Sequence, residues 1–222
     1  MTVPLADRPG LVVAVDQLIS SMPGLIGQIR GFLTRKRHKV TMAFVDHYSG
    51  YSHVHFQQST SALETLEAKR CFERFAKSYR TRIGHYHADN GIFAEKGFVD
   101  QVHDSSQTMS FCAVNAHHQN GVAKKKIRDL QEAARTMLVH AKQRWPTAIT
   151  ANLWPHAIRM ANAVTNRAPK LKESTVSPID VEPVVKHSHA VGQSDLSIQS
   201  QSHIELHSRE RSLVHRCRDI DI

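Results

Sequence analysis

The sequence predicts a mixed α/β domain built on five strands, from the spacing of its apolar residues and the location of its aromatic residues. Apolar runs of strand length alternate with segments whose apolar residues recur at helical spacing. All aromatic residues lie between Phe32 and Trp154, which locates the folded core. We expect a leader over residues 1–10, a core domain over 11–170 and a mostly disordered tail over 171–222. The tail lacks large aromatic side chains, so little burial offsets the entropy lost on ordering.

The first half of the core predicts three strands and a helix. Residues 11–16 form a short apolar run that ends at an acid, which is typical of a buried strand. Strands at 40–45 and 51–56 are separated by the polar turn 46–50, which favours a hairpin. A helix is expected over 61–79.

Ser61 is the predicted cap of that helix, with Glu64 three residues later. Its apolar face is expected to carry Leu63, Leu66, Phe72 and Phe75. Cys71 lies among these apolar residues, so we interpret it as a packing residue.

The second half alternates strands with helices. Residues 82–88 predict a fourth strand that delivers Asp89 at its end, and a short helix at 96–103 and a fifth strand at 109–113 follow. Two longer helices are predicted from apolar residues at helical spacing, at 122–142 and at 149–167. Pro155 either kinks the last helix or marks its start.

Charge and cysteine content limit the function. The formal net charge of +9 and the pI of about 9.7 favour a polyanionic partner. Three cysteines without a CxxC pair fit a reducing compartment. The apolar runs are too short to span a bilayer, and the N-terminus has no secretion-signal layout, so we expect no membrane partner.

Three positions suggest a phosphoryl-transfer site. Asp16 and Asp89 follow predicted strands, and Lys124 stands 35 positions after Asp89 at a predicted helix start. Three carboxylates at such places could converge on one sheet edge and hold two Mg²⁺ ions, which bind oxygen ligands. Taken alone, the two aspartates also fit surface acids that cap loops.

Five motifs occur in an order that resembles a known family: Val15-Asp16-Gln17-Leu18, Phe44-Val45-Asp46-His47-Tyr48-Ser49, His87-Ala88-Asp89-Asn90-Gly91, Gln119-Asn120-Gly121-Val122-Ala123 and Ala134-Arg135-Thr136-Met137-Leu138. Residues 11–180 resemble the integrase catalytic core of copia-type LTR retrotransposons, within the retroviral integrase superfamily. The resemblance implies an RNase H-like fold and DNA strand transfer that depends on Mg²⁺ or Mn²⁺. It further implies action in the nucleus and a homo-oligomer, as a dimer of cores on DNA.

The resemblance also assigns roles. Asp16 and Asp89 match the first two catalytic acids and are the implied metal ligands. Lys124 stands where the family has glutamate, and its positive charge repels an ion instead of coordinating it. A base with a depressed pKa is one role for Lys124. The other interpretation is a decayed element that cannot complete the reaction.

Nucleic-acid contacts are expected from the loop and helix around this position. Gln119, Asn120, Lys125 and Arg128 are the candidate residues, with Arg128 the best phosphate contact. The alternative function is a noncatalytic nucleic-acid-binding remnant that keeps the fold and the basic face.

Two other groups of residues have both a functional and an ordinary interpretation. His85 and His87 share a strand face with Asp89 and could bind a transition metal, support the acid, or lie on a half-solvated flank. The basic run 35–39 could contact phosphates, resemble a nuclear-import signal, or be a solvated connection.

Overall fold

The computed structural model describes residues 3–27, 34–113, 120–168 and 177–180. The chain divides into two units, Met1–Pro183 and Val184–Ile222, and all described residues lie in the first. The tail predicted over residues 171–222 lies outside the described residues except for 177–180, where the Ile179 N–H donates to the carbonyl oxygen of Asn166 at 3.1 Å. Gln119 also lies outside the described residues.

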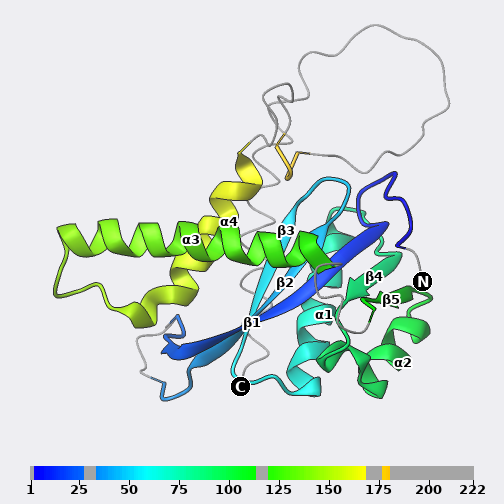
Figure 1. The fold of residues 1–222 in the computed structure, drawn as a ribbon, viewed down its shortest axis with the longest axis horizontal. Helices are drawn as coiled ribbons and strands as arrows, with labels where there is room; N and C mark the ends of the chain where they lie inside the picture. Colours follow the sequence, from blue (N-terminus) through cyan, green and yellow to red (C-terminus); the bar gives the residue numbers. More distant parts are fainter. Residues whose placement is uncertain (1–2, 28–33, 114–119, 169–176, 181–222) are drawn as a thin grey trace, which may run out of the picture. The chain divides into compact units, whose positions relative to one another are not determined.

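A mixed sheet of five strands forms the centre of the first unit (Figure 1). Its strands are β1 (Val12–Gly24), β2 (His38–Asp46), β3 (Ser52–Gln57), β4 (His85–Ala88) and β5 (Thr108–Phe111). They lie in the order β3-β2-β1-β4-β5. The first three strands pair antiparallel, whereas β4 pairs parallel with both β1 and β5. The sequence prediction of a five-stranded mixed α/β domain is confirmed.

Four α-helices accompany the sheet in the described part of the chain: α1 (Ala62–Ser78), α2 (Lys96–Asp104), α3 (Gly121–Arg144) and α4 (Trp154–Arg167). Two short 3₁₀ helices, η1 (Ile92–Ala94) and η3 (Ala151–Leu153), precede α2 and α4. The last helix was predicted to start too early. Pro155 lies in its first turn, where the missing N–H costs nothing, and so marks its start. None of the described helices has the length and apolar character needed to cross a membrane.

Strand β1 is longer than the sequence pattern indicates. It continues past Asp16 to Gly24, pairing Leu18 with Thr41 and Ile19 with Val40 before its register shifts. The side chain of Ile19 is exposed, so this extension carries no buried apolar alternation that a sequence pattern could show. Backbone pairing with β2, packing of Leu18 on the second apolar cluster and a hydrogen bond from the Trp154 indole N–H to the Met22 carbonyl oxygen (2.8 Å) hold it.

The two faces of the sheet pack against different helices. One face meets α1 and α2, in a cluster that includes Val13, Val15, Phe44, Phe72, Tyr86 and Phe98. The other side carries a second cluster with α3 and α4, which includes Phe56, Leu130, Ala134, Trp154, Ile158 and Ala161. Because side chains alternate along a strand, residues next to Val13 and Val15 in β1 point toward the α3 side.

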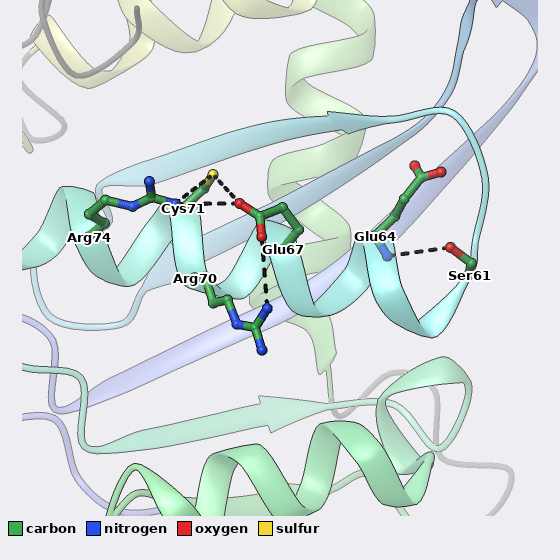
Figure 2. Close-up of polar contacts among 6 residues, drawn as sticks. All are labelled: Ser61, Glu64, Glu67, Arg70, Cys71 and Arg74. Atoms are coloured by element: carbon green, nitrogen blue, oxygen red, sulfur yellow. Dashed lines mark hydrogen bonds and ion pairs between the residues drawn. The ribbon is translucent and has the colours of Figure 1, made fainter. Parts of the chain in front are cut away.

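The start of α1 is stabilised by the N-cap residue Ser61 and by the carboxylate of Glu64. Ser61 accepts a hydrogen bond from the Glu64 N–H at 3.4 Å (Figure 2), which confirms the predicted cap. The Glu64 carboxylate turns back to accept from the N–H groups of Gln58 (2.6 Å) and Ser59 (3.1 Å). The predicted apolar face is wrong at Leu63, which is 73 % exposed because the buried face is rotated toward Thr65 and Ala68.

Cys71 is buried in the middle of α1, which confirms its predicted packing role. Its thiol lies 3.6 Å from a Glu67 carboxylate oxygen, and the Arg74 guanidinium approaches both groups (Figure 2). Arg70 pairs with the same carboxylate at 4.0 Å. These exposed or half-exposed charges cover the thiol on the surface of α1.

A buried charge lies under α1 that the sequence pattern did not indicate. Lys69 is completely buried, and its Nζ is 2.9 Å from Oε1 of Glu73, without the geometry of a hydrogen bond. Tyr86 and Gln107 donate hydrogen bonds to the same oxygen, at 2.9 and 2.7 Å. Burial raises the pKa of Tyr86 well above its usual value, and the charge of Glu73 raises it further. Glu73 therefore joins α1 to β4 and to the residue before β5.

We predict that Glu73→Ala lowers the free energy of unfolding by about 3–5 kcal/mol, because it leaves the Lys69 ammonium buried without a counter-charge. Replacing both partners by apolar residues, as in Lys69→Met with Glu73→Leu, is expected to recover most of this loss. Urea unfolding followed by circular dichroism measures both variants. A loss below about 1 kcal/mol for Glu73→Ala would mean that solvent screens the pair.

Candidate functional site

The two predicted acids lie side by side in the sheet. Strands β1 and β4 pair in parallel with Val12 beside His85 and Ala14 beside His87, a constant offset of 73 residues. Asp16 and Asp89 differ by the same offset and therefore extend this register, one on each strand line. Neighbouring strands are about 4.8 Å apart, so the two carboxyl groups lie close together.

Both acids are positioned by local backbone contacts. Asp16 is 8 % exposed and points away from the cluster that contains Val13 and Val15, toward the α3 side. Its Oδ1 accepts a hydrogen bond from the N–H of Gln17 at 2.9 Å. Asp89 is half-buried, and its Oδ1 accepts from the N–H of Gly91 at 3.2 Å. A turn therefore holds Asp89 where β4 ends.

The start of α3 is tied to β1 beside this pair. Asn120 is completely buried and donates a hydrogen bond from Nδ2 to the carbonyl oxygen of Val15, at 3.0 Å. Lys124 follows four residues later in the first turns of the helix, on the same side as Asn120. Its side chain is half-buried. The bond to Val15 thus brings Lys124 toward the strand that carries Asp16.

Cys112 lies next to one of the predicted positions, Asp89. Strands β4 and β5 pair with an offset of 23 residues, which puts Cys112 beside Asp89. The N–H of Cys112 donates to the carbonyl oxygen of Ala88 at 3.0 Å, which continues the ladder past the end of the strand.

The charges of all three positions reach the Cys112 thiol. Burial raises its pKa, Asp89 raises it further, Lys124 opposes the increase, and Asp16 adds to it. The strand registers place Asp16, Asp89 and Cys112 on three neighbouring strand lines, and the Asn120 anchor brings the start of α3, with Lys124, toward β1.

The chemistry of this group does not fit a two-metal centre. Two Mg²⁺ ions need several oxygen ligands, and here the third position supplies an ammonium group. Within the described residues, no three side chains of His, Cys, Asp or Glu are grouped so that they could hold an ion. The arrangement offers two carboxylates facing a cation, and no metal-dependent step follows from it.

The two histidines of β4 are more buried than a half-solvated flank, so that interpretation was wrong. His85 is 6 % exposed and His87 is 3 % exposed. Ser110 Oγ lies 2.7 Å from Nε2 of His85 and 2.9 Å from Nδ1 of His87, and Cys112 Sγ lies 3.6 Å from Nε2 of His87. This polar ladder between β4 and β5 ends at Cys112 and supports the strand end that carries Asp89.

The candidate nucleic-acid contacts separate into two groups. Lys125 and Arg128 are exposed on α3 and available to a polyanion. Asn120 has an internal partner instead, because its buried amide donates to Val15. Gln119 lies outside the described residues. Sequence reasoning missed Cys112, because the predicted strand 109–113 included it, whereas β5 ends at Phe111 and leaves Cys112 beside Asp89.

Comparison with solved structures assigns the fold. The HTLV-2 integrase catalytic core domain, in complex with magnesium and in a trimeric form, superimposes with a TM-score of 0.56, 14 % identity, and coverage of 80 % of this chain and 99 % of that chain. The catalytic core domain of BIV integrase gives a TM-score of 0.52 and 15 % identity, over 78 % and 93 % of the two chains. The chain has the RNase H-like fold of retroviral integrase catalytic cores.

A larger assembly shows the same likeness. The simian T-cell lymphotropic virus intasome, in complex with PP2A regulatory subunit B56 gamma, gives a TM-score of 0.60 and 12 % identity, with 88 % of this chain and 62 % of that chain covered. No protein-family model and no curated protein sequence matches the chain. Identities this low establish the fold, and function has to be argued from the site.

We predict that Asn120→Ala lowers the free energy of unfolding by about 1–3 kcal/mol, because the Val15 carbonyl loses its donor. Amide hydrogen exchange over residues 121–124 is expected to quicken more than exchange in the strands, since the bond anchors the helix start. Gln131→Ala, at an exposed position of α3, is the control. Equal exchange in both variants would show that packing alone holds the start of α3.

Proposed function

We propose that this chain is the integrase core of a copia-type LTR retrotransposon which still binds DNA but no longer transfers strands. The observation that carries the proposal is the register of Asp16 with Asp89 on neighbouring parallel strands, with Lys124 held on the same side. The superfamily fold supports the integrase part, and the Lys124 position supports the loss of strand transfer.

The net charge of the site accounts for the proposed loss of strand transfer. Asp16 and Asp89 with a third carboxylate would carry three negative charges toward two divalent ions. With Lys124 in the third position, two negative charges and one positive charge leave a single net negative charge. A lysine at this position would repel a second divalent ion instead of coordinating it. A lysine acting as a base would not supply the missing coordination.

Along α3, no nearby acid replaces the missing one. Glu132 is the next glutamate of that helix, and it lies two helical turns after Lys124, roughly 12 Å along the axis. Asp129 is exposed on the helix surface. The helix therefore offers no alternative ligand at the level of Asp16.

Binding to DNA requires exposed basic side chains but no metal ligands. Lys125 and Arg128 are exposed in the first turns of α3, which contain no acidic residue, so positive side chains and the positive helix end coincide. This arrangement costs stability by itself and suits a phosphate backbone. A noncatalytic nucleic-acid-binding remnant of an integrase keeps the same contacts, and metal-dependent cleavage is what distinguishes the two.

We predict that the unmodified chain shows no strand transfer in the reversal direction, with a branched DNA substrate and Mg²⁺ or Mn²⁺. Lys124→Glu is expected to give product on the order of 100-fold above the assay background, since it restores the third carboxylate. The readout is the ligated strand on a denaturing gel, with metal binding followed separately by calorimetry.

The control carries Lys124→Glu together with Asp89→Asn, which keeps the restored glutamate and removes a neighbouring acid. Activity in Lys124→Glu that disappears in the double variant supports the site. Product from the unmodified chain would overturn the assigned effect of Lys124. Metal binding without product in Lys124→Glu would favour the noncatalytic remnant.

We also predict that Arg128→Gln weakens duplex binding and reduces the slope of log affinity against log salt by about 1, as expected for one lost phosphate contact. Lys125→Gln is expected to behave similarly. Lys142→Gln, an exposed lysine near the other end of the same helix, is the matched control. Fluorescence anisotropy between 50 and 200 mM salt, a range in which phosphate contacts are sensitive, measures all three. Equal slopes for Arg128→Gln and Lys142→Gln would remove α3 from the proposed interface.

A further inference from the structure

The side chain of Trp145, at the end of α3, is the largest apolar group that the described residues leave open to solvent. It is 54 % exposed, whereas Trp154 is buried and donates its indole N–H to the Met22 carbonyl oxygen. Tryptophan contributes a large buried area when it packs, so an exposed indole gives up much of that stabilisation. A single exposed apolar residue assigns no function by itself, since protein surfaces contain many. The role of Trp145 therefore depends on the groups around its ring.

The backbone of Trp145 is fixed on both sides. Its N–H donates to the carbonyl oxygen of Ala141 at 2.9 Å, in the last turn of α3. Its carbonyl oxygen accepts from the N–H groups of Ala148 (3.2 Å) and Ile149 (3.1 Å), which follow the helix. The backbone that carries the ring therefore has little freedom left to lose when a ligand binds, which favours binding.

The guanidinium of Arg144 lies over the indole ring of Trp145. Its central carbon is 5.6 Å from the ring centroid. Such a contact is weakly stabilising at an exposed site without any ligand. No carboxylate of the described residues forms an ion pair with Arg144. A guanidinium that stacks by its flat face keeps the N–H groups at its edge for an anion. Arg144 therefore places phosphate donors beside an aromatic surface.

A long segment around Trp145 contains no acidic residue. Between residues 133 and 168, which include the second half of α3 and all of α4, there is no Asp or Glu. The nearest acid along α3 is Glu132, about 20 Å before Trp145 along the helix axis. Residues 142–148 are all exposed. A polyanion can therefore reach the ring without meeting a carboxylate of this segment.

The sequence neighbours of Trp145 favour a nucleic-acid base over an apolar protein surface as the ligand. Residues 142–144 are Lys-Gln-Arg and residues 146–148 are Pro-Thr-Ala, so no continuous apolar patch extends along the chain from the ring. The buried centre of a protein interface is usually more apolar than this. A base needs only a flat aromatic surface on which to stack, and the phosphates of its strand need cations nearby. Trp145 and Arg144 offer both.

We propose that Trp145 and Arg144 bind an unpaired base of a nucleic-acid strand, with the base stacked on the indole and the adjoining phosphate paired with Arg144. The inference rests on the proposed nucleic-acid partner and adds a single-strand contact about 25 Å further along α3 than Arg128. Unstacking a base from a duplex costs free energy, so the site takes its base from a frayed end or an overhang. Stacking of this kind tolerates any sequence.

Two oligonucleotides of equal charge test stacking with the full chain. One carries about 10 thymidines, a length within the site size of single-strand binding modules, and the other has abasic positions in place of the bases. The unmodified chain is expected to bind the thymidine strand about 10-fold more tightly, as for one stacked base. Stacking is also expected to quench the fluorescence of Trp145, while the buried Trp154 keeps its emission.

Substitutions at Trp145 separate stacking from folding. Trp145→Ala is expected to bind the two strands equally. Trp145→Phe keeps an aromatic ring, so it should retain most of the preference for thymidine while losing the quenching. Met160→Ala, at a position of α4 that is 58 % exposed, controls for the loss of an exposed apolar side chain and should match the unmodified chain. Arg144→Gln should weaken binding of both strands and lower the salt slope by about 1.

The outcomes separate this inference from the proposed function. Equal affinity of the unmodified chain for the two strands, or binding of neither, overturns the inference. Self-association that disappears in Trp145→Ala also overturns it, because the ring would then belong to a protein contact. Duplex binding that depends on Arg128, without any preference for thymidine, keeps the proposed function and removes this site. A preference that depends on Trp145 while Arg128→Gln leaves duplex binding unchanged supports this site and removes the start of α3 from the interface.

Discussion

The parallel pairing of β4 with β1 is the constraint on which the candidate site depends. Asp16 and Asp89 are far apart in the sequence, and only the fixed 73-residue offset between these strands makes them neighbours. A shift of one residue would turn one of the two side chains to the opposite face, toward the apolar cluster with α1. That cluster, with Val13 and Val15 on its side of β1, therefore also fixes the direction of Asp16. Core packing and site geometry are two results of one register.

The fold does not depend on the charge at residue 124. Lys124 lies in the first turns of α3, half-buried, and the anchor of that helix is the buried Asn120 bonded to Val15. Changing the charge at residue 124 leaves the anchor and the apolar face around Leu130 intact. The charge at residue 124 therefore affects electrostatics at the site far more than it affects folding.

The sequence predicted those parts of the fold that local patterns determine. Buried strands, the hairpin, the Ser61 cap and the helical segments follow from alternation, turn residues and apolar spacing. It did not predict the extension of β1, because exposed residues held by backbone pairing leave no apolar signal. The charged Lys69 in the core was missed for a related reason, since its partner Glu73 makes burial tolerable only in three dimensions. Asp16 and Asp89 were found by resemblance, but their neighbour Cys112 becomes apparent only when the register of β5 is known.

Asp46 and Asp89 both lie at strand ends, but their hydrogen bonds show that only Asp46 is used to hold a turn. Asp46 at the end of β2 accepts hydrogen bonds from the N–H groups of Gly10 and Ser49 and from the Ser49 hydroxyl, so both of its oxygens serve the turn. Asp89 accepts from the N–H of Gly91, at the longer distance of 3.2 Å, and stands beside Asp16 instead of a set of donors. Neighbouring carboxylates repel each other, and a nearby positive charge reduces that repulsion. Lys124 is a cation near the acid pair, since its charge and those of Asp16 and Asp89 all act on the Cys112 thiol.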